Sequence, residues 1–157
     1  YGNATTAPYT EQFYIGGANS VRAFSARSIG PGGYPPETDR KYTYINHVGD
    51  IRIEANIEYR FRMIADLHGA VFLDAGNVWL MRKDENRPNG EFTLKNFPKQ
   101  VALGTGAGLR YDLDFLVFRL DCGVALHDPS AVGQSGYYNI AKFKDGLALH
   151  FAIGYPF

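Results

Sequence analysis

"IRIEANIEYRFR", residues 51–62, decides the fold class of this chain. Its odd-numbered residues are apolar or aromatic, whereas its even-numbered residues are charged or, once, an asparagine. This period-two alternation predicts an extended strand, because successive side chains of a strand point to opposite faces. The run is long compared with the usual strand of about 5–6 residues. The stretch therefore predicts a long strand with one apolar and one charged face.

Four further stretches alternate in the same way, and together they predict an all-β, antiparallel chain of five strands. The contrast between the two faces is as clear in the last stretch as in residues 51–62. It is weaker in the other three stretches, one of which has the aromatic Phe72 on an otherwise polar face. The chain also has 18 Gly, 11 Tyr and 11 Phe, which favour turns and strands. The four further predicted strands are 67–79, 101–113, 116–126 and 147–157.

The connections between these strands are alternately short and long. The two long ones, after Trp79 and after Leu126, are polar, an asymmetry typical of outer-membrane barrels. Trp79 adjoins a long connection, and other aromatic residues lie near the short turns, as two interfacial girdles would require. A soluble β-sandwich binding module would also alternate, but strand length, loop asymmetry and aromatic positions favour a sheet whose apolar face meets lipid. The aromatic residues near the short-turn ends are Tyr59, Phe61, Tyr111, Phe115, Tyr155 and Phe157.

Composition and motifs exclude several other classes of function. With 16 Lys+Arg against 16 Asp+Glu, the net charge is 0, which gives no field for nucleic acid. The lone Cys122 excludes an internal disulfide and a thiolate metal cluster. A hydrolytic site joining His150, Asp121 and a serine lacks any nucleophile motif, so we expect no enzyme and no cofactor. No metal site is predicted either, because metal-ligand spacing is absent among His47, His68, His127 and His150.

Five strands are too few to close a barrel, since small barrels begin at about eight. An open sheet in lipid would leave unpaired backbone groups at several kcal/mol each. We therefore expect strands before Tyr1, or several copies of the chain, to complete the wall.

Several stretches, in this order, resemble a known family. They are "FYIGGANSVRAFSARSIGPG" (13–32), "IEYRF" (57–61), "FLDAGNVW" (72–79), "GTGAGLRYDL" (104–113) and "ALHFAIGYPF" (148–157). Through them the chain resembles the C-terminal part of the BamA/TamA outer-membrane assembly proteins, also called the bacterial surface antigen domain. The resemblance implies a transmembrane β-barrel of about sixteen strands in the bacterial outer membrane. Residues 1–48 would be a long inward-folded loop, and residues 49–157 the last five strands.

The resemblance also implies a function. Such proteins fold and insert other outer-membrane proteins without ATP or cofactor, across a weak seam between the first and last strands. The expected partners are the outer-membrane lipid bilayer, unfolded outer-membrane protein substrates, and accessory lipoproteins or periplasmic subunits. A two-partner secretion transporter or another outer-membrane pore is the alternative, which periplasmic domains upstream of Tyr1 would help to discriminate.

The loop-tip motif Val21, Arg22, Ala23 and Phe24 contains the first candidate site residue. A guanidinium folded into a barrel interior requires carboxylate partners, and the polar strand faces offer Glu58 and Asp74. The resemblance implies the same two partners. On a solvated surface loop, by contrast, an ion pair would contribute only about 0–1 kcal/mol. Ala23 replaces the glycine of most family members, which requires that its backbone avoid positive φ and very close neighbours.

The terminal strand is the second candidate site. Phe157 resembles the carboxyl-terminal recognition signal of outer-membrane proteins and also suits an interfacial anchor. Gly154 weakens strand regularity and Pro156 removes a ladder donor, so we predict poor pairing at this end of the seam. The glycines of 104–108 are predicted to leave room for the inserted loop, since a dinucleotide fingerprint needs a following helix. The seam residues named by this hypothesis are Phe151, Ile153, Gly154, Tyr155 and Phe157.

Overall fold

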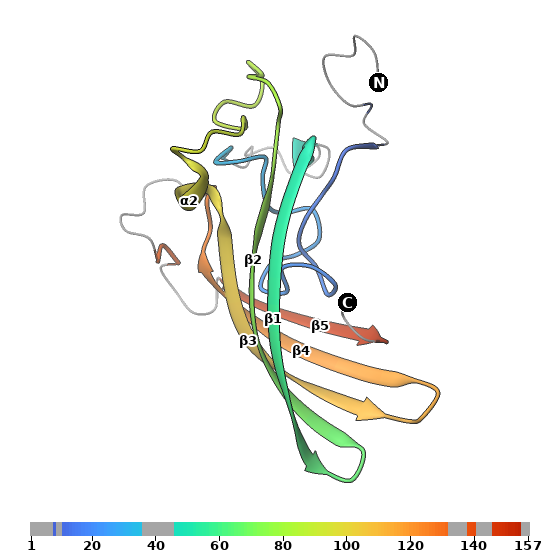
Figure 1. Cartoon of the computed structure of the whole chain (residues 1–157). Helices are drawn as coiled ribbons and strands as arrows, with labels where there is room; N and C mark the ends of the chain where they lie inside the picture. Colours follow the sequence, from blue (N-terminus) through green and yellow to red (C-terminus); the bar gives the residue numbers. More distant parts are fainter. Residues whose placement is uncertain (1–7, 9–10, 36–45, 132–137, 141–145, 155–157) are drawn as a thin grey trace.

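The computed structural model shows one five-stranded antiparallel sheet in the order β1-β2-β3-β4-β5 (Figure 1). Each strand pairs with its neighbour in sequence, as the alternation predicts. The strands are β1 (Ile51–Ile64), β2 (Leu67–Trp79), β3 (Ala102–Asp112), β4 (Val117–His127) and β5 (Leu147–Ile153), and a short helix, α2 (Phe97–Gln100), precedes β3. The structure describes residues 8, 11–35, 46–131, 138–140 and 146–154.

The ends of the sheet differ in places from the sequence prediction. β1 continues to Ile64, so that β1 and β2 meet in a tight hairpin. Among the described residues β5 spans Leu147–Ile153, and residues 155–157 of the predicted strand lie outside them. Gly154 takes a φ of 95°, which leaves the strand conformation, although its amide still donates to the Val117 carbonyl at 2.8 Å. Tyr155 and Phe157 of the predicted seam lie outside the described residues.

The two faces of the sheet are inverted relative to a soluble protein. On β1, Ile57 and Tyr59 are 68% and 67% exposed, whereas the side chain of Glu58 between them is 2% exposed. On β2, Val71 and Leu73 are likewise exposed and Asp74 is buried. This pattern fits a barrel wall whose apolar face meets lipid and whose polar face lines the interior.

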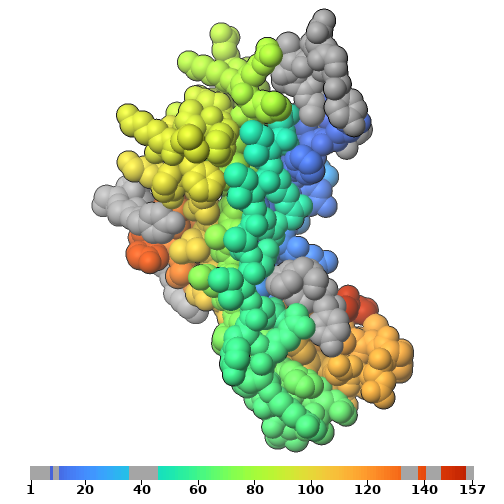
Figure 2. Space-filling model, viewed as in Figure 1, coloured from blue at the N-terminus to red at the C-terminus, as the bar shows by residue number. Residues whose placement is uncertain are grey.

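Residues 11–35, here called the inserted segment, lie against the concave polar face of the sheet (Figures 1 and 2). The segment is attached to the wall near both of its ends: Phe13 pairs with Gly49, and the Gly32 amide donates to the Val78 carbonyl at 2.7 Å. Between these points its apolar side chains pack on the sheet and form the core. That core consists of Ile15, Val21, Ala23, Phe24, Ile29, Val78, Ala102 and Ala125, with Ile140 packed against it.

The prediction of Trp79 as an exposed girdle residue is wrong. Trp79 is fully buried, because the connection after β2 folds back over it. Its ring packs against Phe92 and Phe97 at centroid distances of 5.5 and 5.4 Å, and its Nε1 donates to Gln100 Oε1 at 2.9 Å. The aromatics at the opposite end match the girdle better, since Tyr59, Phe61, Tyr111 and Phe115 are all exposed.

Over the described part of the chain, no helix has the length and apolar character needed to cross a membrane.

Candidate functional site

A tight turn brings the tip of the inserted segment to the middle of the sheet. Gly16 and Gly17 have φ values of 98° and 95°, a region that favours glycine. The Gly17 amide donates to the Phe24 carbonyl at 2.8 Å and closes the base of the turn. A side chain at Gly16 would place its Cβ 2.3 Å from the Ser25 carbonyl oxygen, so the turn requires glycine there. The turn projects Arg22 toward β1 and β2.

Arg22 is completely buried and contacts both carboxylates that the sequence names. Its Nε and Nη2 donate to the two carboxylate oxygens of Asp74, each at 2.8 Å, and its Nη1 donates to Glu58. The backbone amide of Arg22 adds a further bond of 3.0 Å to Asp74 Oδ2. Such paired, charge-assisted bonds fix orientation as well as position. The structure therefore brings Arg22, Glu58 and Asp74 into one buried cluster.

A contact with Arg22 explains why the aromatic Phe72 occurs on the otherwise polar face of β2. The guanidinium carbon of Arg22 lies 3.6 Å from the centre of the Phe72 ring. An arginine over an aromatic ring gains a favourable cation–π interaction, most strongly where water is excluded. Gly106 on β3 makes space for this ring, because a Cβ there would lie 2.5 Å from Phe72 Cζ. The aromatic exception is thus part of the arginine site.

Further charges extend the cluster across the sheet. Glu58 also accepts bonds from Arg60 Nε on its own strand, at 2.5 Å, and from Arg110 Nη2 on β3, at 3.0 Å. Arg110 Nη1 lies 2.6 Å from Asp121 Oδ1 on β4, and Asp121 Oδ2 lies 3.1 Å from Arg119 Nε. These last two are charge contacts whose angles fall outside hydrogen-bond geometry. The resulting chain of three arginines and three carboxylates, here called the arginine clamp, comprises Asp74, Arg22, Glu58, Arg110, Asp121 and Arg119.

Arg119, the last residue of the clamp, also contacts the inserted segment. Arg119 Nη2 donates to the Ala18 carbonyl at 2.7 Å and to Asn19 Oδ1 at 2.6 Å. Ring nitrogen Nε2 of His150, on β5, lies 2.9 Å from the Arg22 carbonyl oxygen. Each of the five strands therefore contributes a polar side chain to the clamp or to the loop tip that it holds.

The Ala23 methyl fits because the strands beside it carry glycine. Ala23 is absent from the positive-φ residues of the described chain, so its methyl brings no backbone strain. A Cβ on Gly104 would lie 2.2 Å from the Ala23 methyl, and one on Gly123 would lie 2.4 Å from the Arg22 carbonyl oxygen. Glycines on β3 and β4 thus leave the space into which the tip inserts.

The other predicted residues lie around the clamp or away from it. Val21 and Phe24 are buried in the core beside the tip. Phe151 and Ile153 are exposed on the apolar face of β5 and do not join the clamp. The sequence analysis did not assign Arg110 or His150 to this site. The contact of Arg110 with Glu58 depends on the relative positions of the strands, and the contact of His150 is with a backbone carbonyl of the loop.

The clamp offers binding and bracing rather than catalysis. Asp121 faces two arginines and His150 faces a backbone carbonyl, so neither activates a serine in this arrangement. Among the described residues, no cluster of three or more His, Cys, Asp or Glu side chains could hold a metal ion. The arrangement therefore ties one segment of backbone to five strands.

Comparison with known proteins agrees with this architecture. The model of the Omp85 superfamily domain matches residues 1–157. Proteins of this superfamily are non-enzymatic β-barrels of the bacterial outer membrane that assemble or translocate proteins. A search of curated proteins found no match.

Replacing Arg22 by methionine in the full-length protein should destabilise the barrel by about 3–5 kcal/mol, because the buried carboxylates of Asp74 and Glu58 each lose an arginine partner. Urea unfolding, followed by heat-modifiable migration on a gel, measures the change. Arg52→Met is the matched control, since Arg52 pairs with Glu54 at a side-chain exposure of 39% and should cost about 0–1 kcal/mol. Equal losses in the two variants would contradict a special role for the buried pair.

Gly123→Val should displace the loop tip, since even the Cβ would meet the backbone of Arg22 and Ala23. Limited proteolysis should then cleave the inserted segment faster than in the wild-type protein. Cys122→Val is a control substitution on the opposite face of the same strand and should leave the cleavage rate unchanged. An unaltered rate in Gly123→Val would show that the tip does not depend on this space.

Proposed function

This chain belongs to the Omp85 superfamily, and from that premise we propose that it forms the closing part of a BamA/TamA-type assembly factor. In this proposal residues 49–157 supply the last five strands of a barrel of about sixteen strands, and residues 1–48 form the loop folded into its lumen. The barrel folds and inserts client β-barrel proteins across a weak seam at β5. Unfolded outer-membrane proteins are the substrates, and accessory lipoproteins or periplasmic subunits are further partners.

The observation that carries this proposal is the attachment of one loop tip to both outer strands of the described sheet. The tip contacts β1 through Glu58 and β5 through His150. A wall braced in this way resists deformation most at β1 and β2, which bind the tip through buried ion pairs, and least at β5, which binds it through one hydrogen bond. Opening of the barrel is then confined to a boundary outside the braced region.

The length and ending of β5 support its role as one side of that boundary. Over the residues that the structure describes, β5 has 7 residues, whereas β1 has 14 and β4 has 11. It stops before Gly154, whose positive φ breaks the strand. A short edge strand offers few backbone hydrogen bonds to a neighbour, so it separates from that neighbour more easily than a long one. The exposed Phe151 and Ile153 would face lipid beside the opening.

The inserted segment argues against a passive diffusion channel. It occupies the concave face, where a porin would have an aqueous path, and it buries charged wall residues such as Asp74 and Arg119. A secretion transporter of the same superfamily remains the alternative outcome of the experiments below.

Charge reversal by Arg22→Glu should abolish client assembly, because three carboxylates would then share one buried site. The test is the level of folded client barrels in cells after depletion of the wild-type protein. Arg52→Glu controls for a reversed charge on the exposed Arg52–Glu54 pair of the same wall. Normal levels of folded client barrels in an Arg22→Glu strain, with the variant present in the membrane at wild-type amounts, would contradict the bracing hypothesis.

A disulfide between β5 and the first strand of the full barrel should stop assembly, because it locks the proposed seam. A cysteine at Ile153 is one suitable position on β5, because its register partner on β4 is Phe118, whereas Leu149 lies opposite the native Cys122. The matched control is a pair at Leu120 and Phe151, which are register partners inside the described sheet. Growth should fail only with the seam disulfide and recover on reduction. If clients fold normally while secretion of one polypeptide fails, the transporter alternative is correct.

A further inference from the structure

A short amphipathic turn covers the outer end of the wall. Residues 92–100, here called the outer-rim turn, are held by helical hydrogen bonds, including Phe97 amide to Thr93 carbonyl at 2.9 Å and Gln100 amide to Asn96 carbonyl at 3.0 Å. Phe92 and Phe97 pack on Trp79, as described above. The turn is thereby fixed to the strands and does not form a free loop.

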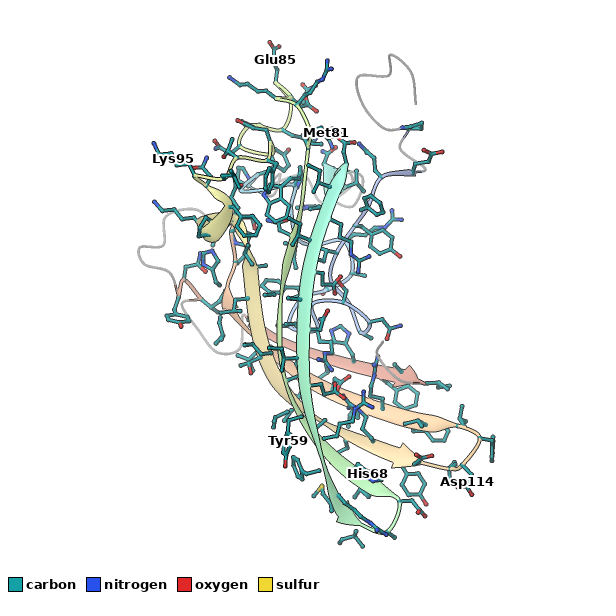
Figure 3. The ribbon with its side chains drawn as sticks, in the orientation of Figure 1. Tyr59, His68, Met81, Glu85, Lys95 and Asp114 are labelled. Carbon is teal, nitrogen blue, oxygen red and sulfur yellow. The ribbon has the colours of Figure 1, made fainter. Side chains whose placement is uncertain are left out.

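The position of Trp79 places this turn on the lipid side of the wall. Trp79 follows Val71 and Leu73 at even spacing on β2, so its side chain belongs to the face that meets lipid. The turn also lies at the end of the sheet that carries the long connections, which is the outer end in barrels of this kind. Figure 3 shows Lys95 projecting away from the strands of the wall. The turn therefore lies at the level of the outer-leaflet headgroups.

The exposed surface of the turn combines one large apolar side chain with two cations. Leu94 is 82% exposed, and Lys95 and Lys99 are also exposed. The two lysines are four residues apart, which puts them on one side of a helical turn. Among the described residues neither ammonium group forms an ion pair. The backbone carbonyl of Lys99 is fixed by His127 Nε2 at 2.8 Å.

We propose that the outer-rim turn binds the phosphate-bearing headgroup of an outer-leaflet lipid. Leu94 enters the acyl region, and Lys95 and Lys99 contact the phosphates. Apolar residues beside lysines at a membrane boundary combine area burial with attraction to anionic lipid. Lipid is the occupant because the turn rests on the face of a transmembrane wall. This site is separate from the arginine clamp and does not depend on client assembly.

The test uses the full-length protein in zwitterionic micelles, titrated with fluorescent bis-phosphorylated lipid A and with its dephosphorylated form. Lys95→Glu combined with Lys99→Glu should weaken binding of the phosphorylated lipid by at least roughly tenfold. Raising the salt concentration should weaken wild-type binding, since salt screens exposed charges. Binding of the dephosphorylated lipid should be weak and similar in both proteins.

Arg82→Glu combined with Lys83→Glu is the matched control, because these exposed cations belong to the same connection but lie beside Asp84 and Glu85. It should change affinity by no more than about twofold if the site is local. Equal losses of affinity in the two double variants would show that binding depends only on the overall charge of the connection, which would contradict a local site. No loss of affinity in the Lys95→Glu, Lys99→Glu variant would also overturn the proposal. Competition by millimolar inorganic phosphate would overturn it in favour of a free-anion site.

Leu94→Asn separates insertion from charge. It should weaken binding of both lipids while leaving the salt dependence intact, because it removes only the apolar contact. Heat-modifiable migration verifies that every variant is folded. If Leu94→Asn binds both lipids like the wild-type protein, Leu94 does not enter the acyl region and the proposal fails in that part.

Discussion

The burial of Arg22 between Asp74 and Glu58 is the interaction on which the rest of the structure depends. A buried charge without a partner is strongly unfavourable, and removing one member of a buried pair costs about 3–5 kcal/mol. Arg22 comes from the inserted segment, whereas both carboxylates come from the wall. The segment therefore supplies the cation that allows those carboxylates to be buried, and the carboxylates hold the segment in the lumen.

The same constraint accounts for the small residues of the wall. A chain of arginines and carboxylates that crosses from β1 to β4 needs space above the strands that it passes. Gly108 supplies such space, since a Cβ there would lie 2.1 Å from Asp121 Oδ1 and 2.5 Å from Arg110 Nη1. Gly104 and Gly123 do the same for the tip. The glycines that weaken strand propensity are thus the ones that admit the charges and the loop.

How much the sequence predicts depends on whether a contact follows from strand periodicity. Alternation predicts five strands and their faces, and the faces are enough to name Glu58 and Asp74 beside Arg22. The burial of Trp79 could not be predicted, because it depends on how residues 81–100 fold back in three dimensions. The contact of His150 with the Arg22 carbonyl could not be predicted either. Every residue has a backbone carbonyl, so the sequence does not indicate which one a histidine will contact.

The magnitudes of these contacts argue that deformation of this wall is concentrated at β5. The described polar link between β5 and the loop tip is the single contact of His150 with the Arg22 carbonyl, and one such hydrogen bond contributes about 0.5–1.5 kcal/mol. Separation of β1 or β2 from the tip would break the buried pairs of Glu58 or Asp74, at several kcal/mol. β5 can therefore shift at a smaller cost than β1 or β2, and the tip stays anchored to the rest of the wall while it does so.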